Sequence, residues 1–145
     1  MKPRKGRRGP PGLLVDTGFV IGLLDKDDDF HAAALRWDRQ LADRPRILTT
    51  AVLLECGDGF AEHDTWRALT TWLDHIARDP RYELVNIDHA MLTRTRAFRD
   101  QHPTRAWSFT DCTSFVVMKA RGITEAFSTD KHFNEAGFDA LLLRP

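Results

Sequence analysis

Residues 13–24 read LLVDTGFVIGLL, a short apolar run that meets a single acid and then continues into a second apolar stretch. The first three residues show no alternation of polar and apolar side chains, which is typical of a strand buried on both faces. Asp16 would then stand at the carboxyl end of this strand. Strands of this kind occur mainly in parallel sheets that helices cover on both sides.

The rest of the chain alternates between similar short runs and stretches with helical periodicity. Further strand candidates lie at 46–48, 82–85, 125–127 and 140–143. Apolar stripes predict helices over 30–41 and 66–77. Asp88 is a candidate helix N-cap, and the apolar stretch 111–120 runs into Gly122, a typical helix stop. This alternation predicts an α/β fold, with a central, mostly parallel β-sheet flanked by helices on both faces.

Length and composition agree with one globular domain. The chain has 145 residues, of which 42% are hydrophobic and 29% charged, and one core is usual at that length. No apolar run approaches the roughly 20 residues of a membrane span, and no secretory apolar segment of ordinary length precedes Asp16. We therefore expect a cytoplasmic protein without a membrane segment. Cys56 and Cys112 have no metal-binding spacing and are expected to pack inside the fold.

A basic segment rich in proline and glycine occupies residues 1–12. It carries 5 of the 21 basic residues and no acid, which leaves 16 basic and 21 acidic residues elsewhere. We expect a flexible tail over 1–12 and a folded domain over 13–145. A basic arm on an acidic body can hold a polyanion, and it can equally act only as a solubilising tail.

Three acids follow a predicted strand or begin a predicted helix, and a fourth interrupts an apolar helix. Asp16 follows the run 13–15, Asp130 lies three residues after Phe127, and Asp111 opens the helix over 111–120. Glu55 lies about one turn into a helix that begins near Thr49 or Thr50, in an otherwise aliphatic stretch. Each alone has a structural explanation, as a helix cap, an Asx-turn or a surface residue.

Taken together, the acids indicate a metal site. Ligands of an open α/β sheet collect outside the carboxyl ends of its strands, where Asp16, Asp111 and Asp130 are expected. Neighbouring carboxylates repel each other, and a hard divalent cation such as Mg²⁺, or alternatively Mn²⁺, removes that repulsion. An oxygen-rich site of this kind indicates phosphoryl-transfer chemistry, in which the cation activates water and neutralises phosphate.

Four sequence motifs, in order over about 13–143, resemble those of PIN-domain ribonucleases. They are Leu-Val-Asp-Thr-Gly-Phe-Val-Ile-Gly-Leu-Leu at 14–24, Thr-Thr-Ala-Val-Leu-Leu-Glu at 49–55, Trp-Ser-Phe-Thr-Asp-Cys-Thr-Ser-Phe at 107–115 and Ser-Thr-Asp-Lys-His-Phe at 128–133, the last followed by Ala-Gly-Phe at 136–138. The third and fourth motifs together are the specific ones. The most similar group is that of the VapC-like toxins of bacterial and archaeal toxin–antitoxin pairs. Gly18 departs from the family pattern, which more often has serine or asparagine there.

The resemblance implies a metal-dependent endoribonuclease that hydrolyses RNA phosphodiester bonds with Mg²⁺ or Mn²⁺. It assigns the catalytic and metal-binding positions to Asp16, Glu55, Asp111 and Asp130, and supporting hydroxyls to Thr17 and Thr129. It further implies that the chain is the toxin of a toxin–antitoxin pair, with a cognate antitoxin protein as partner, RNA as substrate and a homodimer as assembly. The folded domain at 13–145 would then be a PIN-like nuclease domain.

Three other classes of protein partly fit the pattern of acids. A haloacid-dehalogenase phosphatase needs a second acid at position 18, which is glycine. A receiver domain would use Asp16, Asp88 and Lys131 but leaves Glu55 and Asp111 unexplained. The serious alternative is a catalytically silent PIN-like module that binds RNA or a partner, which the loss of an acid would indicate.

Other residues received smaller roles. His132 is the only histidine within two residues of a proposed ligand, and a surface or helix-start role is favoured for it. Trp107 precedes the third motif and is the best candidate for stacking on a base. Trp37 and Trp66 lie on apolar stripes and are expected in the core.

Overall fold

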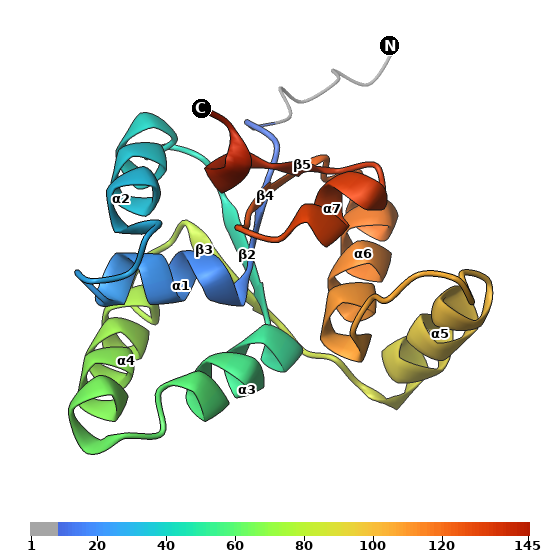
Figure 1. The fold of residues 1–145 in the computed structure, drawn as a ribbon, viewed down its shortest axis with the longest axis horizontal. Helices are drawn as coiled ribbons and strands as arrows, with labels where there is room; N and C mark the ends of the chain where they lie inside the picture. Colours follow the sequence, from blue (N-terminus) through green and yellow to red (C-terminus); the bar gives the residue numbers. More distant parts are fainter. Residues whose placement is uncertain (1–8) are drawn as a thin grey trace, which may run out of the picture.

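A five-stranded, fully parallel sheet forms the centre of the molecule in the computed structural model, which describes residues 9–145. Its strands lie in the order β3-β2-β1-β4-β5 (Figure 1). They span Leu13–Val15 (β1), Arg46–Thr49 (β2), Tyr82–Val85 (β3), Glu125–Phe127 (β4) and Asp139–Ala140 (β5). The predicted α/β class and parallel sheet are therefore confirmed.

Helices cover both faces of the sheet. One side carries α1 (Thr17–Leu24), α2 (His31–Gln40), α3 (Thr50–Gly59) and α4 (His63–Ile76). The other side carries α5 (His89–Asp100), α6 (Phe109–Arg121) and α7 (Lys131–Glu135), and Figure 1 shows the two groups on either side of the strands. Leu13 and Val15 pack into the first core and Leu14 into the second, so that β1 is buried on both faces as predicted.

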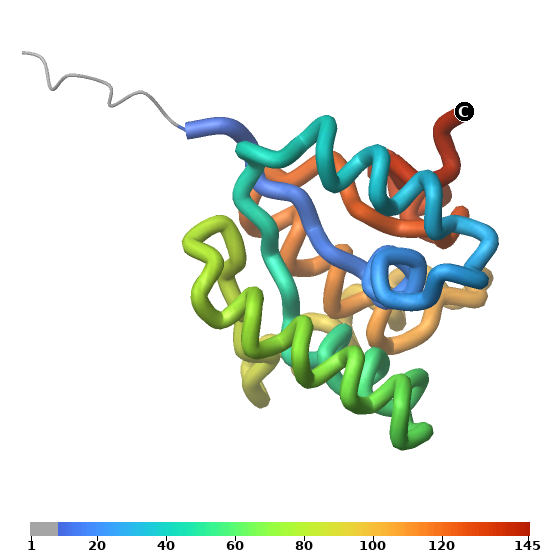
Figure 2. Tube along the Cα trace, turned by 90° about the vertical axis from the view of Figure 1, so that its left-hand side faces the viewer, coloured from blue at the N-terminus to red at the C-terminus, as the bar shows by residue number. Residues whose placement is uncertain are grey.

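The connections of β1 create a topological switch point at the carboxyl ends of the strands, where open α/β sheets have their ligand-binding crevice. From β1 the chain proceeds to β2 and β3 on one side and later returns to β4 and β5 on the other. Figure 2 shows β1 and β2 side by side and the chain continuing from β1 into α1. Ligands of open α/β sheets bind where the strand order switches direction in this way. Here that point lies beyond Val15 and Phe127, between the carboxyl ends of β1 and β4.

The last predicted strand, 140–143, is wrong beyond its first residue. β5 ends at Ala140, and Leu141–Leu143 form a 3₁₀ turn. Leu141 and Leu142 both enter the core on the α1–α4 side, whereas successive residues of a strand point to opposite faces. Leu142 also donates its backbone N–H to the Ser128 carbonyl, at 3.2 Å, instead of extending the sheet.

A buried guanidinium fixes α2 against the opposite, amino-terminal edge of the sheet. Arg46 is only 1% exposed and forms an ion pair with the Asp38 carboxylate. It also donates to the carbonyls of Asp38 and Leu41, at 3.1 and 3.3 Å. A buried charge with this many partners has a structural role, because its solvation must be replaced by protein groups. No part of it reaches toward the acids of the predicted site.

The first residues of the domain are attached to the body. Arg44 donates from Nε to the Pro11 carbonyl, at 2.6 Å, and the backbone N–H of Leu13 donates to the Pro45 carbonyl, at 2.8 Å. The basic residues of the predicted tail, all within 1–8, lie outside the described residues. Within 9–145, no helix combines the length and hydrophobicity that a membrane crossing requires.

Candidate active site

Asp111 is held by the N-terminus of α6. The Ser108 hydroxyl accepts a hydrogen bond from the Asp111 backbone N–H, at 3.0 Å, and Asp111 Oδ2 accepts one from the Ser108 N–H, at 3.2 Å. This reciprocal pair is a capping box. The prediction that Asp111 opens the helix is wrong by two positions, because the helix begins at Phe109 with Ser108 as its N-cap. In the first turn, Asp111 still faces the positive end of the helix dipole.

Asp130 is positioned by the start of α7. Asp130 Oδ1 accepts a hydrogen bond from the His132 backbone N–H, at 2.9 Å, so that Asp130 caps this short helix. The Asp130 N–H donates to the Ser128 hydroxyl oxygen, at 3.0 Å. The three-residue segment between β4 and α7 therefore turns tightly and presents the Asp130 carboxylate at the crevice.

Ser128 connects the ends of β1 and β4. Its hydroxyl donates to Asp16 Oδ2 at 2.7 Å while accepting from the Asp130 N–H. The backbone strengthens this link, because the Asp16 N–H donates to the Phe127 carbonyl, at 3.0 Å. Ser128 is buried, and Asp16 is only 6% exposed. One hydroxyl thus orients the carboxylate that follows β1 and the backbone that precedes Asp130.

The crowding of carboxylates alters their acidity. The pKa of Asp16 is raised to about 7, mainly by burial and to a smaller extent by the charges of Asp111 and Glu55, with the Ser128 hydrogen bond acting against them. Burial also raises the pKa of Asp111, and the neighbouring Asp130 charge adds to this. The ionised forms of these groups are therefore destabilised, and a bound cation would stabilise them.

The predicted acids do not all lie equally close together. Among residues 9–145, Asp111, Asp130 and His132 each offer a ligand atom within 4.8 Å of the others. Asp16 joins this group through Ser128, and Glu55 affects Asp16 through its charge from the second turn of α3. Glu55 is half-buried rather than enclosed by aliphatic side chains. The tight group therefore contains two of the predicted acids and one histidine that was given a minor role.

The sequence does not indicate the positions of two polar side chains at this site. Ser128 lies within its motif without a predicted role, and a surface or helix-start role is predicted for His132. His132 Nδ1 lies 3.2 Å from Asp111 Oδ2 and 3.3 Å from Asp130 Oδ1. The signal in the sequence was the pattern Ser-x-Asp-x-His at 128–132, in which alternate side chains of a tight turn can point the same way.

The tryptophan expectations need correction. Trp107 is 5% exposed, its ring lies edge-on to Phe115, and its Nε1 donates to Glu135 Oε2 at 3.3 Å, so it is not available for stacking on a base. Trp66, expected in the core, is 48% exposed. Trp37 is partly buried against the core, as predicted.

The supporting hydroxyls border the same crevice. Thr17 is buried, and its hydroxyl has no hydrogen-bond partner within residues 9–145. Thr129 lies directly over Gly18: a β-carbon at position 18 would overlap Thr129 Oγ1 and lie 3.3 Å from its Cβ and Cγ2. Gly18, which departs from the family pattern, therefore leaves the space that the Thr129 side chain fills.

These donors fit a divalent cation. Asp16, Asp111 and Asp130 supply carboxylate oxygens, which suit Mg²⁺ and Mn²⁺. The partnerless Thr17 hydroxyl lies beside Asp16, where a cation or its water could satisfy it. No cysteine belongs to the group, because burial raises the pKa of the nearby Cys56 thiol to about 12 and keeps it protonated.

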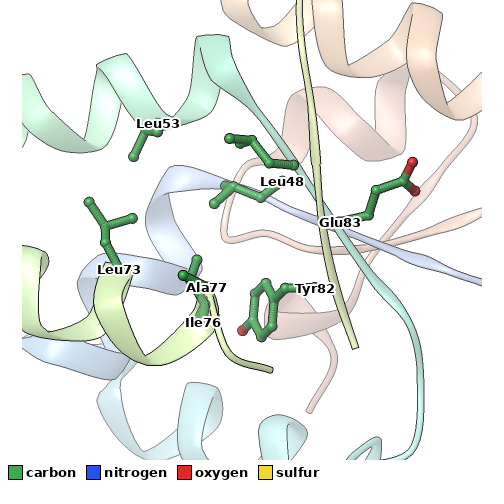
Figure 3. Close-up of a pocket in the computed structure, with 8 residues that line it drawn as sticks. Leu48, Leu53, Leu73, Ile76, Ala77, Tyr82 and Glu83 are labelled. Carbon is green, nitrogen blue, oxygen red and sulfur yellow. The ribbon is translucent and has the colours of Figure 1, made fainter. Parts of the chain in front are cut away.

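The apolar pocket in Figure 3 is separate from this site. It has a volume of about 410 Å³ between α3, α4 and β3. Its lining is aliphatic apart from Tyr82 and Glu83, and it includes none of the acids discussed above. Its one carboxylate, Glu83, forms an ion pair with Arg121, so the chemistry is assigned to the acidic crevice.

The raised pKa of Asp16 predicts a pH-dependent effect of Asp16→Asn on stability. Folded Asp16 holds its proton up to about pH 7, whereas the unfolded chain releases it near 3.8, so that stability is lost as the pH rises through this window. In EDTA, Asp16→Asn should exceed wild type in free energy of unfolding by about 2–4 kcal/mol at pH 8. The advantage should shrink as the pH falls toward 4. Urea unfolding measures it, and an equal difference at both ends of the window contradicts the assignment.

The contact between Gly18 and Thr129 predicts a coupled pair. Gly18→Ala should lower the free energy of unfolding by about 1–2 kcal/mol, because the new methyl group overlaps the Thr129 hydroxyl. In a Thr129→Ala background the overlap is gone, and the same change should be neutral or stabilising. The control is Gly59→Ala, since a β-carbon at Gly59 meets nothing within 4 Å. Additive effects of the two substitutions, measured by urea unfolding, would contradict the contact.

Comparison with known proteins identifies the family. The sequence profile of the PIN domain matches residues 13–139. The 23S rRNA-specific endonuclease VapC20 of Mycobacterium tuberculosis (strain CDC 1551 / Oshkosh) is 28% identical over 135 residues, covering 87% of this chain and 95% of that protein. The crystal structure of Mycobacterium tuberculosis VapC20, described as a sarcin-ricin loop cleaving toxin, matches with 27% identity and a TM-score of 0.76, over 92% of this chain and 99% of that one.

Two more distant structures share the fold. FitAcB from Neisseria gonorrhoeae is 17% identical with a TM-score of 0.60, over 88% of this chain and 94% of that one. VapBC2 from Rickettsia felis, bound to a DNA fragment from their promoter, is 14% identical with a TM-score of 0.63, over 88% and 96%. With the profile spanning most of the chain and the fold agreeing throughout, this protein belongs to the PIN domain family.

Proposed function

We propose that this protein is a metal-dependent endoribonuclease that hydrolyses RNA phosphodiester bonds and acts as the toxin of a toxin–antitoxin pair. The observation that carries the proposal is the convergence of Asp16, Asp111 and Asp130 on the crevice between β1 and β4, where burial holds the pKa of Asp16 near 7. An environment that disfavours the ionised form of a carboxylate lowers the stability of the fold, and it is typical of sites that bind a cation.

The cation is Mg²⁺, with Mn²⁺ as the alternative. Asp16, Glu55, Asp111 and Asp130 would hold it, as catalytic and metal-binding acids. When bound, it supplies charge neutralisation at the scissile phosphate and lowers the pKa of water. Because a ligand must be deprotonated, Asp16 has to release the proton that it retains up to about pH 7, so that metal affinity rises with pH in this range.

The protein's own groups prepare the site for this chemistry. The Ser128 hydroxyl orients Asp16, and the Ser108 capping box keeps Asp111 from rotating away. The hydroxyls of Thr17 and Thr129 border the crevice and would orient the substrate or the attacking water. Positioning of this type lowers the barrier because the reacting groups need little rearrangement in the transition state.

The substrate class is RNA, and the first target to test is 23S rRNA. The relative with 28% identity is named a 23S rRNA-specific endonuclease, and the solved structure with 27% identity is described as cleaving the sarcin-ricin loop. Both align with nearly the full length of this chain. The domain boundary that we propose is 13–145, with the basic segment 1–12 as an additional contact to phosphate or as a solubilising tail.

The partners that we propose are a cognate antitoxin protein and a second copy of the chain. A ribonuclease toxin in the cytoplasm needs an inhibitor, and the relative is described as a toxin. Leu84, exposed on the edge strand β3, lines the apolar pocket between α3, α4 and β3 and leaves apolar surface that a second copy would cover. A catalytically silent module has no specific support, since the family's four acidic positions all retain their acids.

Cleavage of ribosomal RNA tests the function. We expect the purified protein to cut 23S rRNA at discrete positions in Mg²⁺ or Mn²⁺ and not in EDTA. Asp111→Asn should reduce the rate by about 100-fold or more, since even the loss of an outer partner of a metal ligand reduces activity 10- to 100-fold. Primer extension locates the cuts, and the rate of their appearance gives the fold-change.

The matched control is Asp43→Asn, which removes an exposed acid from the turn before β2, at the amino-terminal edge of the sheet. It should cut like wild type. Equal cutting by wild type and Asp111→Asn would contradict the proposed site. Tight RNA binding without cleavage of either total RNA or ribosomes would instead favour the silent binding module.

A further inference from the structure

The imidazole of His132 faces two of the carboxylates. Its Nδ1 lies 3.2 Å from Asp111 Oδ2 and 3.3 Å from Asp130 Oδ1, and all three residues offer ligand atoms within 4.8 Å of each other. The side chain is half-buried. Capping of α7 requires only the His132 backbone N–H, which Asp130 Oδ1 accepts, so the helix start does not explain where the ring points.

The other ring nitrogen faces a third carboxylate. His132 Nε2 lies 4.0 Å from Glu135 Oε2, one turn further along α7. The same Glu135 oxygen accepts a hydrogen bond from the buried Trp107 Nε1, at 3.3 Å. Trp107 is packed against Phe98 and Phe115, so that Glu135 is tied to a rigid part of the core. Glu135 thus lies on the outer side of the ring, away from Asp111 and Asp130.

The arrangement resembles that of histidines that bind metals, with the difference that the 4.0 Å from Nε2 to Glu135 Oε2 is longer than a hydrogen bond. One ring nitrogen contacts the cation, and the other donates its N–H to a carboxylate that fixes the orientation of the ring. With Nδ1 on the cation, the neutral ring would carry its one hydrogen on Nε2, the nitrogen that faces Glu135.

We propose that His132 Nδ1 is a nitrogen ligand of the cation held by Asp111 and Asp130, and that Glu135 is the positioning residue for its ring. This inference rests on the metal dependence proposed above and deepens it. A nitrogen donor among carboxylates shifts the preference from Mg²⁺, which favours an all-oxygen shell, toward first-row divalent ions such as Mn²⁺. The site would then bind Mn²⁺ more tightly than a purely acidic site does.

Electron spin-echo spectroscopy of the Mn²⁺-loaded protein tests the ligand directly, without reference to cleavage. We expect nitrogen modulation typical of a directly bound imidazole in wild type, replaced by the ¹⁵N pattern when the protein is grown on ¹⁵N-histidine. His132→Gln should lose the modulation and bind Mn²⁺ about 10-fold or more weakly, while Mg²⁺ binding changes less. His89→Gln, which alters an exposed histidine at the start of α5, is the matched control and should keep both properties.

Glu135→Gln separates a positioning role from direct ligation. It should retain the nitrogen modulation and lower Mn²⁺ affinity by a smaller factor than His132→Gln. The isotope comparison uses the unaltered protein, so it tests whether a histidine nitrogen binds Mn²⁺ even if a variant fails to fold. Mn²⁺ bound to wild type without nitrogen modulation overturns the inference and leaves the ribonuclease proposal intact. Failure of wild type to bind Mn²⁺, with RNA cleavage persisting in EDTA, overturns both.

Discussion

The Ser128 hydroxyl donates to Asp16 at the end of β1 and accepts from the backbone N–H of Asp130 beyond β4. This two-way hydrogen bond lies where the strand order switches direction, and it brings together carboxylates that repel each other. β1 and β4 are neighbouring strands whose side chains are buried on both faces of the sheet, so the carboxylates at their ends cannot move apart to relieve this repulsion. The rest of the fold supplies the rigidity that keeps these charges at one edge.

The arrangement has a thermodynamic consequence. Burial of Asp16 and Asp111 opposes their ionisation, so without a cation the free energy of unfolding is lower near neutral pH than in acid. A bound cation would offset this by binding the folded chain and not the unfolded one. Stability and metal binding are therefore linked through the same carboxylates. The Arg46–Asp38 pair at the opposite edge is charged as well, but there the counter-charge is supplied by the protein itself.

Much of the architecture could be predicted from local patterns. Buried strands of a parallel sheet have continuous apolar runs, and four of the five predicted strands occur where such runs indicated. The fifth is wrong beyond Ala140 because Leu141 and Leu142 enter the same core, and hydrophobicity alone does not reveal which face a residue enters. Three of the acids could be found because each lies near the end of a strand or the start of a helix, and Glu55 because it interrupts an aliphatic stretch. The contacts of Ser128 and His132 could not be predicted, because they join residues of separate elements. Gly18 is similar, since only the fold reveals that Thr129 occupies its space.

The central claim is that the acids at the ends of β1 and β4 hold a divalent cation. Anomalous diffraction from crystals equilibrated with Mn²⁺ tests it most directly, because the anomalous signal locates the metal without assumptions about its ligands. We predict anomalous density in the crevice, in contact with carboxylate oxygens of Asp111 and Asp130 and near Asp16. Crystals at saturating Mn²⁺ in which the crevice is empty, or in which the density lies away from these carboxylates, would contradict the claim.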